Sequence, residues 1–148
     1  MNLHKREVAR SQIDTAIDLF LDGKDYLSVI TLAGAGEEIL GSLIARAGKK
    51  RMIDHLIDLD KKLSKGGRQF KIINQEINGF RNSLKHADDP TEDIVDVVED
   101  QEHAIAMLAR ALTNYHELEG KLSVKMEQFY TWLKQNRSEL FDNEENST

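Results

Sequence analysis

Apolar residues recur at helical spacing along almost the whole chain, and this pattern restricts the fold more than any other feature. The 148 residues include a single proline, Pro90, and no segment alternates apolar and polar residues as a half-buried strand does. A chain of this length fits one domain and buries about 68–70% of its unfolded surface, enough for a core without disulfides. The sequence therefore predicts an all-α, antiparallel up-and-down bundle of five or six helices.

Glycines and capping residues divide the chain into the predicted helices. Asp89-Pro90-Thr91-Glu92 is a start signal, because it places a capping Asp before a Pro and a Glu three residues after the cap. Small residues such as Gly34 and Gly36 let another helix approach closely. The expected helices are Leu3–Leu21, Asp25–Ala47, Lys50–Leu63, Arg68–Ala87, Asp89–Glu119 and a last helix from Leu122 to Leu133, with a loop at 64–67. Residues 1–141 are expected to form one domain, and the polar segment 142–148 a disordered tail.

The charge is unevenly distributed. The net charge is −6, but residues 46–86 hold 11 Lys/Arg and 4 Asp/Glu, whereas residues 87–148 hold 5 and 15. A local basic surface can attract a polyanion despite an acidic total. The same segment can equally be a solvated surface that pairs with acidic helices of the bundle, and the sequence leaves both interpretations open.

The sequence also indicates a compartment. It contains no Cys, so disulfides and thiolate metal sites are excluded. The segment from Met1 to Glu7 lacks the apolar core of a signal peptide. The longest apolar stretch, from Ile39 to Ala47, is shorter than the roughly 20 residues that span a bilayer. We therefore expect a cytoplasmic protein that does not enter a membrane.

The run Arg81-Asn82-Ser83-Leu84-Lys85-His86 has the sharpest chemical content. An Arg offers a planar fork of donors to a phosphate, and a His transfers protons near neutral pH. On a predicted helix Asn82 and His86 are four residues apart, so the amide can orient the imidazole. Lys85 and Asn78 lie on the same polar arc and are candidate RNA-binding residues. The pattern suits chemistry on an RNA phosphodiester.

This run, the helix order and the small-residue second helix with Glu37 and Glu38 resemble the HEPN superfamily of helical ribonucleases and toxins, from about Leu3 to Leu133. The resemblance implies a homodimer whose two motifs meet at one interface, and metal-independent cleavage in which the ribose 2′-OH attacks the adjacent phosphorus. It implies three catalytic roles and two supporting candidates. His86 is the general base or acid, Arg81 binds the phosphate, Asn82 positions the site, and Glu37 and Glu38 are the supporting residues.

The resemblance also implies a toxin or phage-defence effector with an antitoxin or nucleotidyltransferase partner. Some toxins of the superfamily carry a Tyr that this partner modifies two residues after the His, and here that position is Asp88. Neutralisation by that route is therefore not expected. The alternative function is a non-catalytic helical dimerisation or protein-interaction module, in which substitution of Arg81 or Glu37 disturbs assembly but no chemistry. The alternative interpretation of the single residues is that Arg81 and Lys85 are solvated and that His86 interacts with the end of its helix.

No cofactor or metal is expected. A di-iron bundle needs acid-x-x-His pairs on two helices, and Asp100-x-x-His103 occurs once. No nucleophile-elbow or Ser-His-Asp pattern appears.

Overall fold

The computed structural model describes residues 1–63 and 70–141, with the side chains of residues 1–62 and 75–141. The predicted loop at 64–67, the start of the fourth helix at Arg68 and the tail at 142–148 lie outside these ranges. The described elements are α1 (Lys5–Leu21), α2 (Tyr26–Arg46), α3 (Met52–Leu63), α4 (Phe70–Ser83), η1 (Pro90–Glu92), α5 (Asp100–Glu119), α6 (Val124–Asn136) and η2 (Ser138–Phe141), where η marks a 3-10 helix. The described ranges contain no strand, and the predicted all-α bundle is confirmed.

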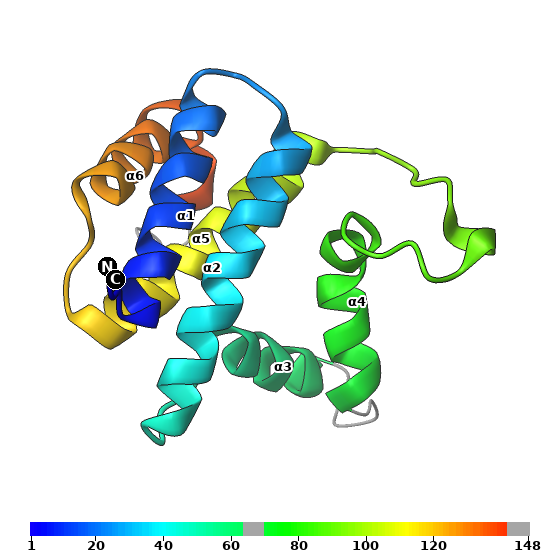
Figure 1. Ribbon diagram of the computed structural model, residues 1–148, viewed down its shortest axis with the longest axis horizontal. Coiled ribbons are helices and arrows are strands. Elements are labelled where there is room, and N and C mark those ends of the chain that lie inside the picture. Colours follow the sequence, from blue (N-terminus) through cyan, green and yellow to red (C-terminus); the bar gives the residue numbers. More distant parts are fainter. Residues whose placement is uncertain (64–69, 142–148) are drawn as a thin grey trace.

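The helices α1, α2, α5 and α6 form the main bundle (Figure 1). The most extensive contacts are those of α2 with α5 and of α2 with α1, and α6 packs on α1. Its core includes Ile13 and Ile17 of α1, Leu108 of α5 and Phe129 of α6, all fully buried. Within α1 and α6 the buried residues recur at steps of three and four, the helical spacing from which the sequence predicts a bundle.

The helix α2 combines small residues with a long apolar stretch. A Cβ added to Gly36 would lie 2.7 Å from Cγ1 of Ile13 and 3.0 Å from the carbonyl oxygen of Ala9. The glycine therefore lets α1 pack closely on α2, as the sequence predicts. By length and composition α2 is the one described helix that could cross a membrane, and half of its most apolar window is buried inside the bundle.

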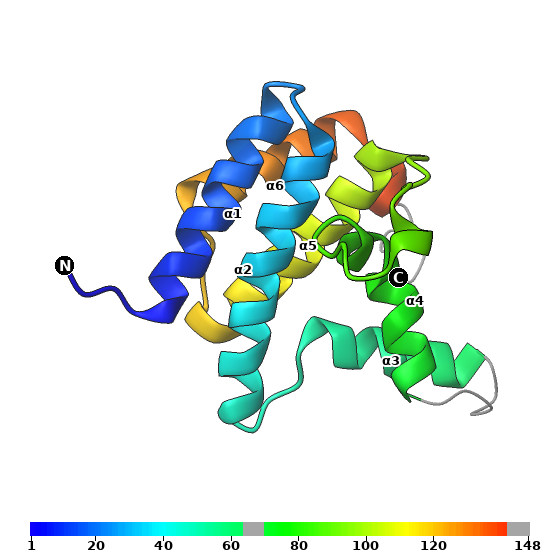
Figure 2. The ribbon, with the colours of Figure 1, turned by 45° about the vertical axis from the view of Figure 1, so that its right-hand side comes forward.

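The helices α3 and α4 form a hairpin at one end of the bundle, beside α2 and α5 (Figures 1 and 2). The hairpin has a small hydrophobic cluster of its own, made by Ile53 and Ile57 with Ile77 packed against them. Few residues of the hairpin contact the main bundle. Phe80 of α4 packs against the main core, and the polar contacts described below provide further attachment.

The fourth helix ends four residues earlier than the spacing predicts, at Ser83 instead of Ala87. The Ser83 hydroxyl donates a hydrogen bond to the Phe80 carbonyl, 2.6 Å away, and such a bond competes with helix continuation. The next two amides bond three residues back, in a tightened final turn. As a result His86 lies outside the helix, and the predicted side-by-side placement of Asn82 and His86 on one helical face is wrong.

The fifth helix begins at Asp100, not at Asp89. Asp89 does cap, since its side chain accepts a hydrogen bond from the Thr91 amide, but only the single turn η1 follows. The next residues are mostly β-branched, which lowers helix propensity, and Glu99 has φ 56°. The segment that carries η1, before the start of α5, instead extends away from the bundle (Figure 1). Ile94 and Val98, which lie within the expected helix Asp89–Glu119, are 92% and 57% exposed.

Candidate functional site

The buried polar and charged side chains of the described residues all belong to one cluster. We call it the arginine–glutamate cluster, and its members come from α2, α4 and α5. They are Glu37, Asn78, Arg81, Arg110 and Asn114. Since a buried charge is costly unless it is paired, this concentration of polar groups marks the position where the sequence departs most from a plain hydrophobic core.

Glu37 is the centre of the cluster and holds one arginine with each carboxylate oxygen. Nη1 of Arg81 lies 3.1 Å from Oε2 of Glu37, and Nη2 of Arg110 lies 3.0 Å from Oε1. Nη1 of Arg110 also donates to Oδ1 of Asn78 at 2.9 Å. The carboxylate of α2 therefore joins α4 and α5, and charge-assisted hydrogen bonds of this kind are stronger than neutral ones.

Asn114 extends the cluster to the start of α3. Its Oδ1 accepts a hydrogen bond from the backbone amide of Met52 at 2.9 Å. Its Nδ2 donates to the backbone carbonyl of Glu37 at 3.3 Å. The amide at the beginning of a helix has no partner within that helix, so Asn114 satisfies it and fixes α3 against α2 and α5.

Arg81 and Arg110 share the single carboxylate of Glu37, and this arrangement affects the pKa of Arg110. Burial lowers the pKa of Arg110, although its attraction to Glu37 acts in the opposite direction, and the nearby Arg81 lowers it further. The net lowering means that desolvation outweighs the stabilisation that Glu37 provides. The cluster therefore holds a positive charge that its own carboxylate does not fully compensate.

Arg81 reaches Glu37 by passing closely over Gly34 of α2. A Cβ added to Gly34 would lie 2.4 Å from Cδ of Arg81, closer than real Cβ atoms approach. The glycine is thus required by the ion pair, because any side chain there displaces the arginine.

We expect Gly34→Ala to lower the free energy of unfolding by about 1–3 kcal/mol, the usual cost of overpacking. The matched control is Gly79→Ala in α4, where an added Cβ meets nothing within 4 Å. That substitution should instead stabilise the protein by up to about 1 kcal/mol, since Ala favours helix over Gly. Urea unfolding followed by circular dichroism measures both. Stabilisation of both variants would contradict the close contact.

The structure separates the motif residues into two groups. Arg81 is 8% exposed, so the alternative interpretation of a solvated Arg81 is wrong. Lys85 is exposed and pairs with Glu38 of α2, with 3.6 Å between Nζ and Oε2. Asn82 is half-buried, and His86 is exposed with no hydrogen bond or ion pair to another described residue. The structure thus brings Arg81 to Glu37, the RNA-binding candidate Asn78 to Arg110, and Lys85 to Glu38.

Sequence reasoning missed Arg110 and Asn114. Both lie on α5, in a helix whose other inward residues are apolar. The available signal was their spacing, because Met107, Arg110 and Asn114 follow steps of three and four along one face. Arg110 stands between Ala109 and Ala111 in the sequence and lies on this inward face. A single arginine on such a face indicates a buried partner for its charge.

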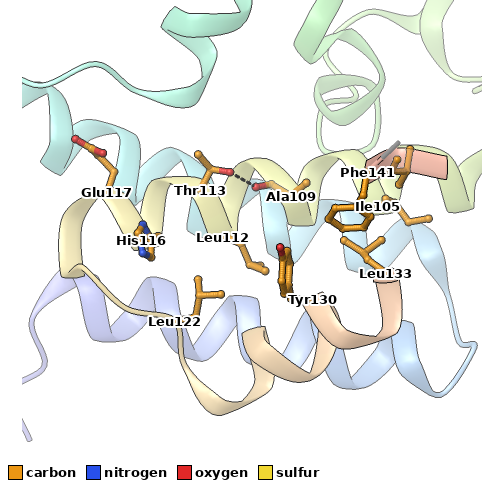
Figure 3. A pocket seen from close by; sticks show the side chains of 11 residues that line it. Ile105, Ala109, Leu112, Thr113, His116, Glu117, Leu122, Tyr130, Leu133 and Phe141 are labelled. Carbon is orange, nitrogen blue, oxygen red and sulfur yellow. Dashed lines mark hydrogen bonds between the residues drawn. The ribbon is translucent and has the colours of Figure 1, made fainter. Parts of the chain in front are cut away.

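A polar hollow of about 200 Å³ opens beside the cluster, and its lining includes Glu37, Asn78, Arg81 and Arg110. A second hollow, of about 430 Å³, lies between α5, α6 and η2 (Figure 3). Figure 3 shows that this one is walled mainly by apolar side chains, among them Leu112, Tyr130 and Leu133, and that Thr113 bonds to a carbonyl of its own helix. Of these two hollows, the first is the one lined by arginines that suit anion chemistry.

The residues considered for a metal have other contacts. The Asp100 side chain accepts from the Gln101 amide, and the His103 ring lies 4.4 Å from that of Phe80. Within residues 1–63 and 70–141, no three His, Asp or Glu side chains are grouped as metal ligands. No family model, curated protein or solved structure compared with the chain matches it.

Proposed function

We propose that the protein is a HEPN-like, metal-independent endoribonuclease that acts as a homodimer. The observation that supports this most is that Arg81 and His86 of the motif lie in different surroundings. Arg81 is fixed by Glu37 beside a polar hollow, whereas His86 is exposed just beyond the end of the same helix. A fixed cation five residues before an accessible imidazole suits transfer of protons at a phosphodiester.

In this proposal His86 accepts the proton of a ribose 2′-OH, whose oxygen attacks the adjacent phosphorus. The bond from phosphorus to the 5′ oxygen of the next nucleotide breaks, and that oxygen takes up a proton. The products are a 2′,3′-cyclic phosphate and a 5′-OH. Arg81 stabilises the negative charge that develops on the phosphoryl oxygens, and Lys85 adds a second cation at the exposed side.

A second copy is part of the proposal because nothing in the described part of one chain orients His86. Two copies related by a two-fold axis would bring two motifs to one interface, and each would face the polar side of the other. The composite site would then contain two imidazoles, enough to remove one proton and supply another. Asn82, half-buried at the end of α4, would position the site.

We expect purified wild-type protein to cleave RNA with a chelator present, and His86→Ala to be at least about 100-fold slower, since general acid–base catalysis contributes 10²–10⁴-fold. The matched control is His55→Ala, which removes an exposed histidine of α3 and should retain the wild-type rate. Product analysis should detect 2′,3′-cyclic phosphate ends. A His86→Ala variant that cleaves at the wild-type rate would exclude this role.

One observation favours the alternative of a non-catalytic interaction module. Ile94, Val97 and Val98 are exposed on the segment that extends from the bundle, and exposed apolar groups of this kind mark protein contacts. In that case the protein would self-associate or bind a partner, and neither wild type nor His86→Ala would cleave RNA in the assay above.

A further inference from the structure

The polar hollow beside the arginine–glutamate cluster includes residues outside the motif. Arg51, at the start of α3, and Ser42, on α2, line it together with Arg81 and Arg110. Arg51 packs over Gly41 of α2, where an added Cβ would lie 3.2 Å from its Cδ. Three guanidinium groups from three different parts of the fold therefore converge on one small space.

The charges around this space do not balance. Counting the charged side chains that line the hollow and their ion-pair partners in the described ranges gives four cations and three carboxylates. They are Arg51, Arg81, Lys85 and Arg110 against Glu37, Glu38 and Asp54. One positive charge remains in excess, and two of the cations are more than nine-tenths buried. An uncompensated charge is costly in such surroundings.

The guanidinium groups also retain unused hydrogen-bond donors. Each has five N–H groups, yet Arg81 donates to Glu37 alone and Arg110 to Glu37 and Asn78 within the described part of the chain. The Nε atoms of Arg81 and Arg110 are buried and have no hydrogen-bond partner there. Buried donors are normally satisfied, so these two donors favour an additional acceptor at this place.

We propose that this hollow binds a phosphate-class oxyanion, held by the guanidinium groups of Arg51, Arg81 and Arg110 and by the Ser42 hydroxyl. Such an anion supplies the missing negative charge, and its oxygens match the planar fork of an arginine. The volume of about 200 Å³ is several times the roughly 30 Å³ that one water occupies in the liquid, so a tetrahedral oxyanion fits with its remaining waters. The site stands independently of RNA cleavage.

The test is calorimetric titration of the full chain with sodium phosphate at constant ionic strength. We expect saturable binding at one site and a rise in melting temperature with phosphate concentration. Arg51→Gln, which removes a rim cation that is 32% exposed, should weaken binding at least about tenfold. Lys62→Gln, an exposed α3 cation outside the hollow, is the matched control and should bind as wild type does.

A second variant distinguishes a specific change in phosphate affinity from a loss of affinity caused by misfolding. Glu38→Gln removes an exposed carboxylate from the lining and should strengthen phosphate binding, a gain that damage to the fold does not produce. The proposal is overturned if phosphate gives no saturable binding to the wild type. It is equally overturned if Arg51→Gln and Lys62→Gln lose the same affinity, because that result would reflect general charge screening.

A parallel titration with the dinucleotide ApA, which carries one internal phosphodiester, identifies the source of the anion. Binding of ApA that phosphate displaces assigns the site to an RNA backbone phosphate, and binding of phosphate alone assigns it to a free anion. His86→Ala should bind phosphate as wild type does. The inference and the proposed function therefore fail separately, because phosphate binding without any RNA cleavage removes only the latter.

Discussion

Glu37→Gln is expected to lower the free energy of unfolding by about 3 kcal/mol. The substitution keeps the size of the side chain but removes the negative charge between Arg81 and Arg110, which are bound by its two oxygens. Removal of one partner from a buried ion pair typically costs about 3–5 kcal/mol, because it leaves an uncompensated charge. Here it leaves two like charges facing each other. Urea unfolding at neutral pH measures the effect.

Two further variants separate charge from general sensitivity. Glu38→Gln changes the neighbouring carboxylate, whose side chain is 60% exposed, and should alter stability by no more than about 0.5 kcal/mol. Arg110→Met should cost clearly less than Glu37→Gln, since the balanced pair of Glu37 and Arg81 remains. If Glu37→Gln proved as stable as Glu38→Gln, Glu37 would not be the electrostatic centre of the cluster.

Phe20→Ala is expected to cost about 3–5 kcal/mol, the range for truncation of a buried phenylalanine. Phe20 is 3% exposed and joins three helices through its ring. Its centroid lies 5.5 Å from that of Tyr26, 5.3 Å from that of Phe129 and 4.8 Å from that of Trp132. The edge-to-face contacts add to the energy of burial. Loss of the ring removes the principal aromatic contact between α1 and α6.

The control for Phe20→Ala is Leu21→Ala, the next residue along the chain. Leu21 is 37% exposed at the end of α1, so its truncation should change stability by about 0.5 kcal/mol or less. Thermal and urea unfolding of the two variants provide the comparison. Similar losses in both would mean that the aromatic contacts contribute nothing beyond local helix stability.

The all-α fold and the inner faces of its best helices could be predicted because apolar spacing reports burial directly. Ile13, Ile17 and Phe129 lie at 3-4 spacing, and all are buried in the core. The end of α4 and the start of α5 could not be predicted in this way. A local hydrogen bond of the Ser83 hydroxyl accompanies the early end of α4. Asp89 caps a single turn, η1, and the β-branched residues after Glu92 do not continue that turn as a helix.

The candidate site was predictable only in part. The sequence marks Arg81 and Glu37 as candidates, but their pairing spans 44 residues of sequence and depends on how α4 docks on α2. The role of Arg110 depends on the same docking. The place of His86 depends on where α4 ends, which helix periodicity does not determine.

Among the described side chains, the hairpin of α3 and α4 is attached to the main bundle by the apolar contact of Phe80 and by a set of buried polar groups. In the described part of the hairpin, Ile53, Ile57 and Ile77 form its own hydrophobic cluster, and Arg81, Arg110 and Asn114 provide hydrogen bonds to the main bundle. Regions with few apolar contacts open at a lower free energy than the global unfolding of a protein, as separate cooperative units. We therefore expect α4, which carries Arg81 and leads to His86, to belong to a cooperative unit that opens locally while the aromatic core of the main bundle stays folded.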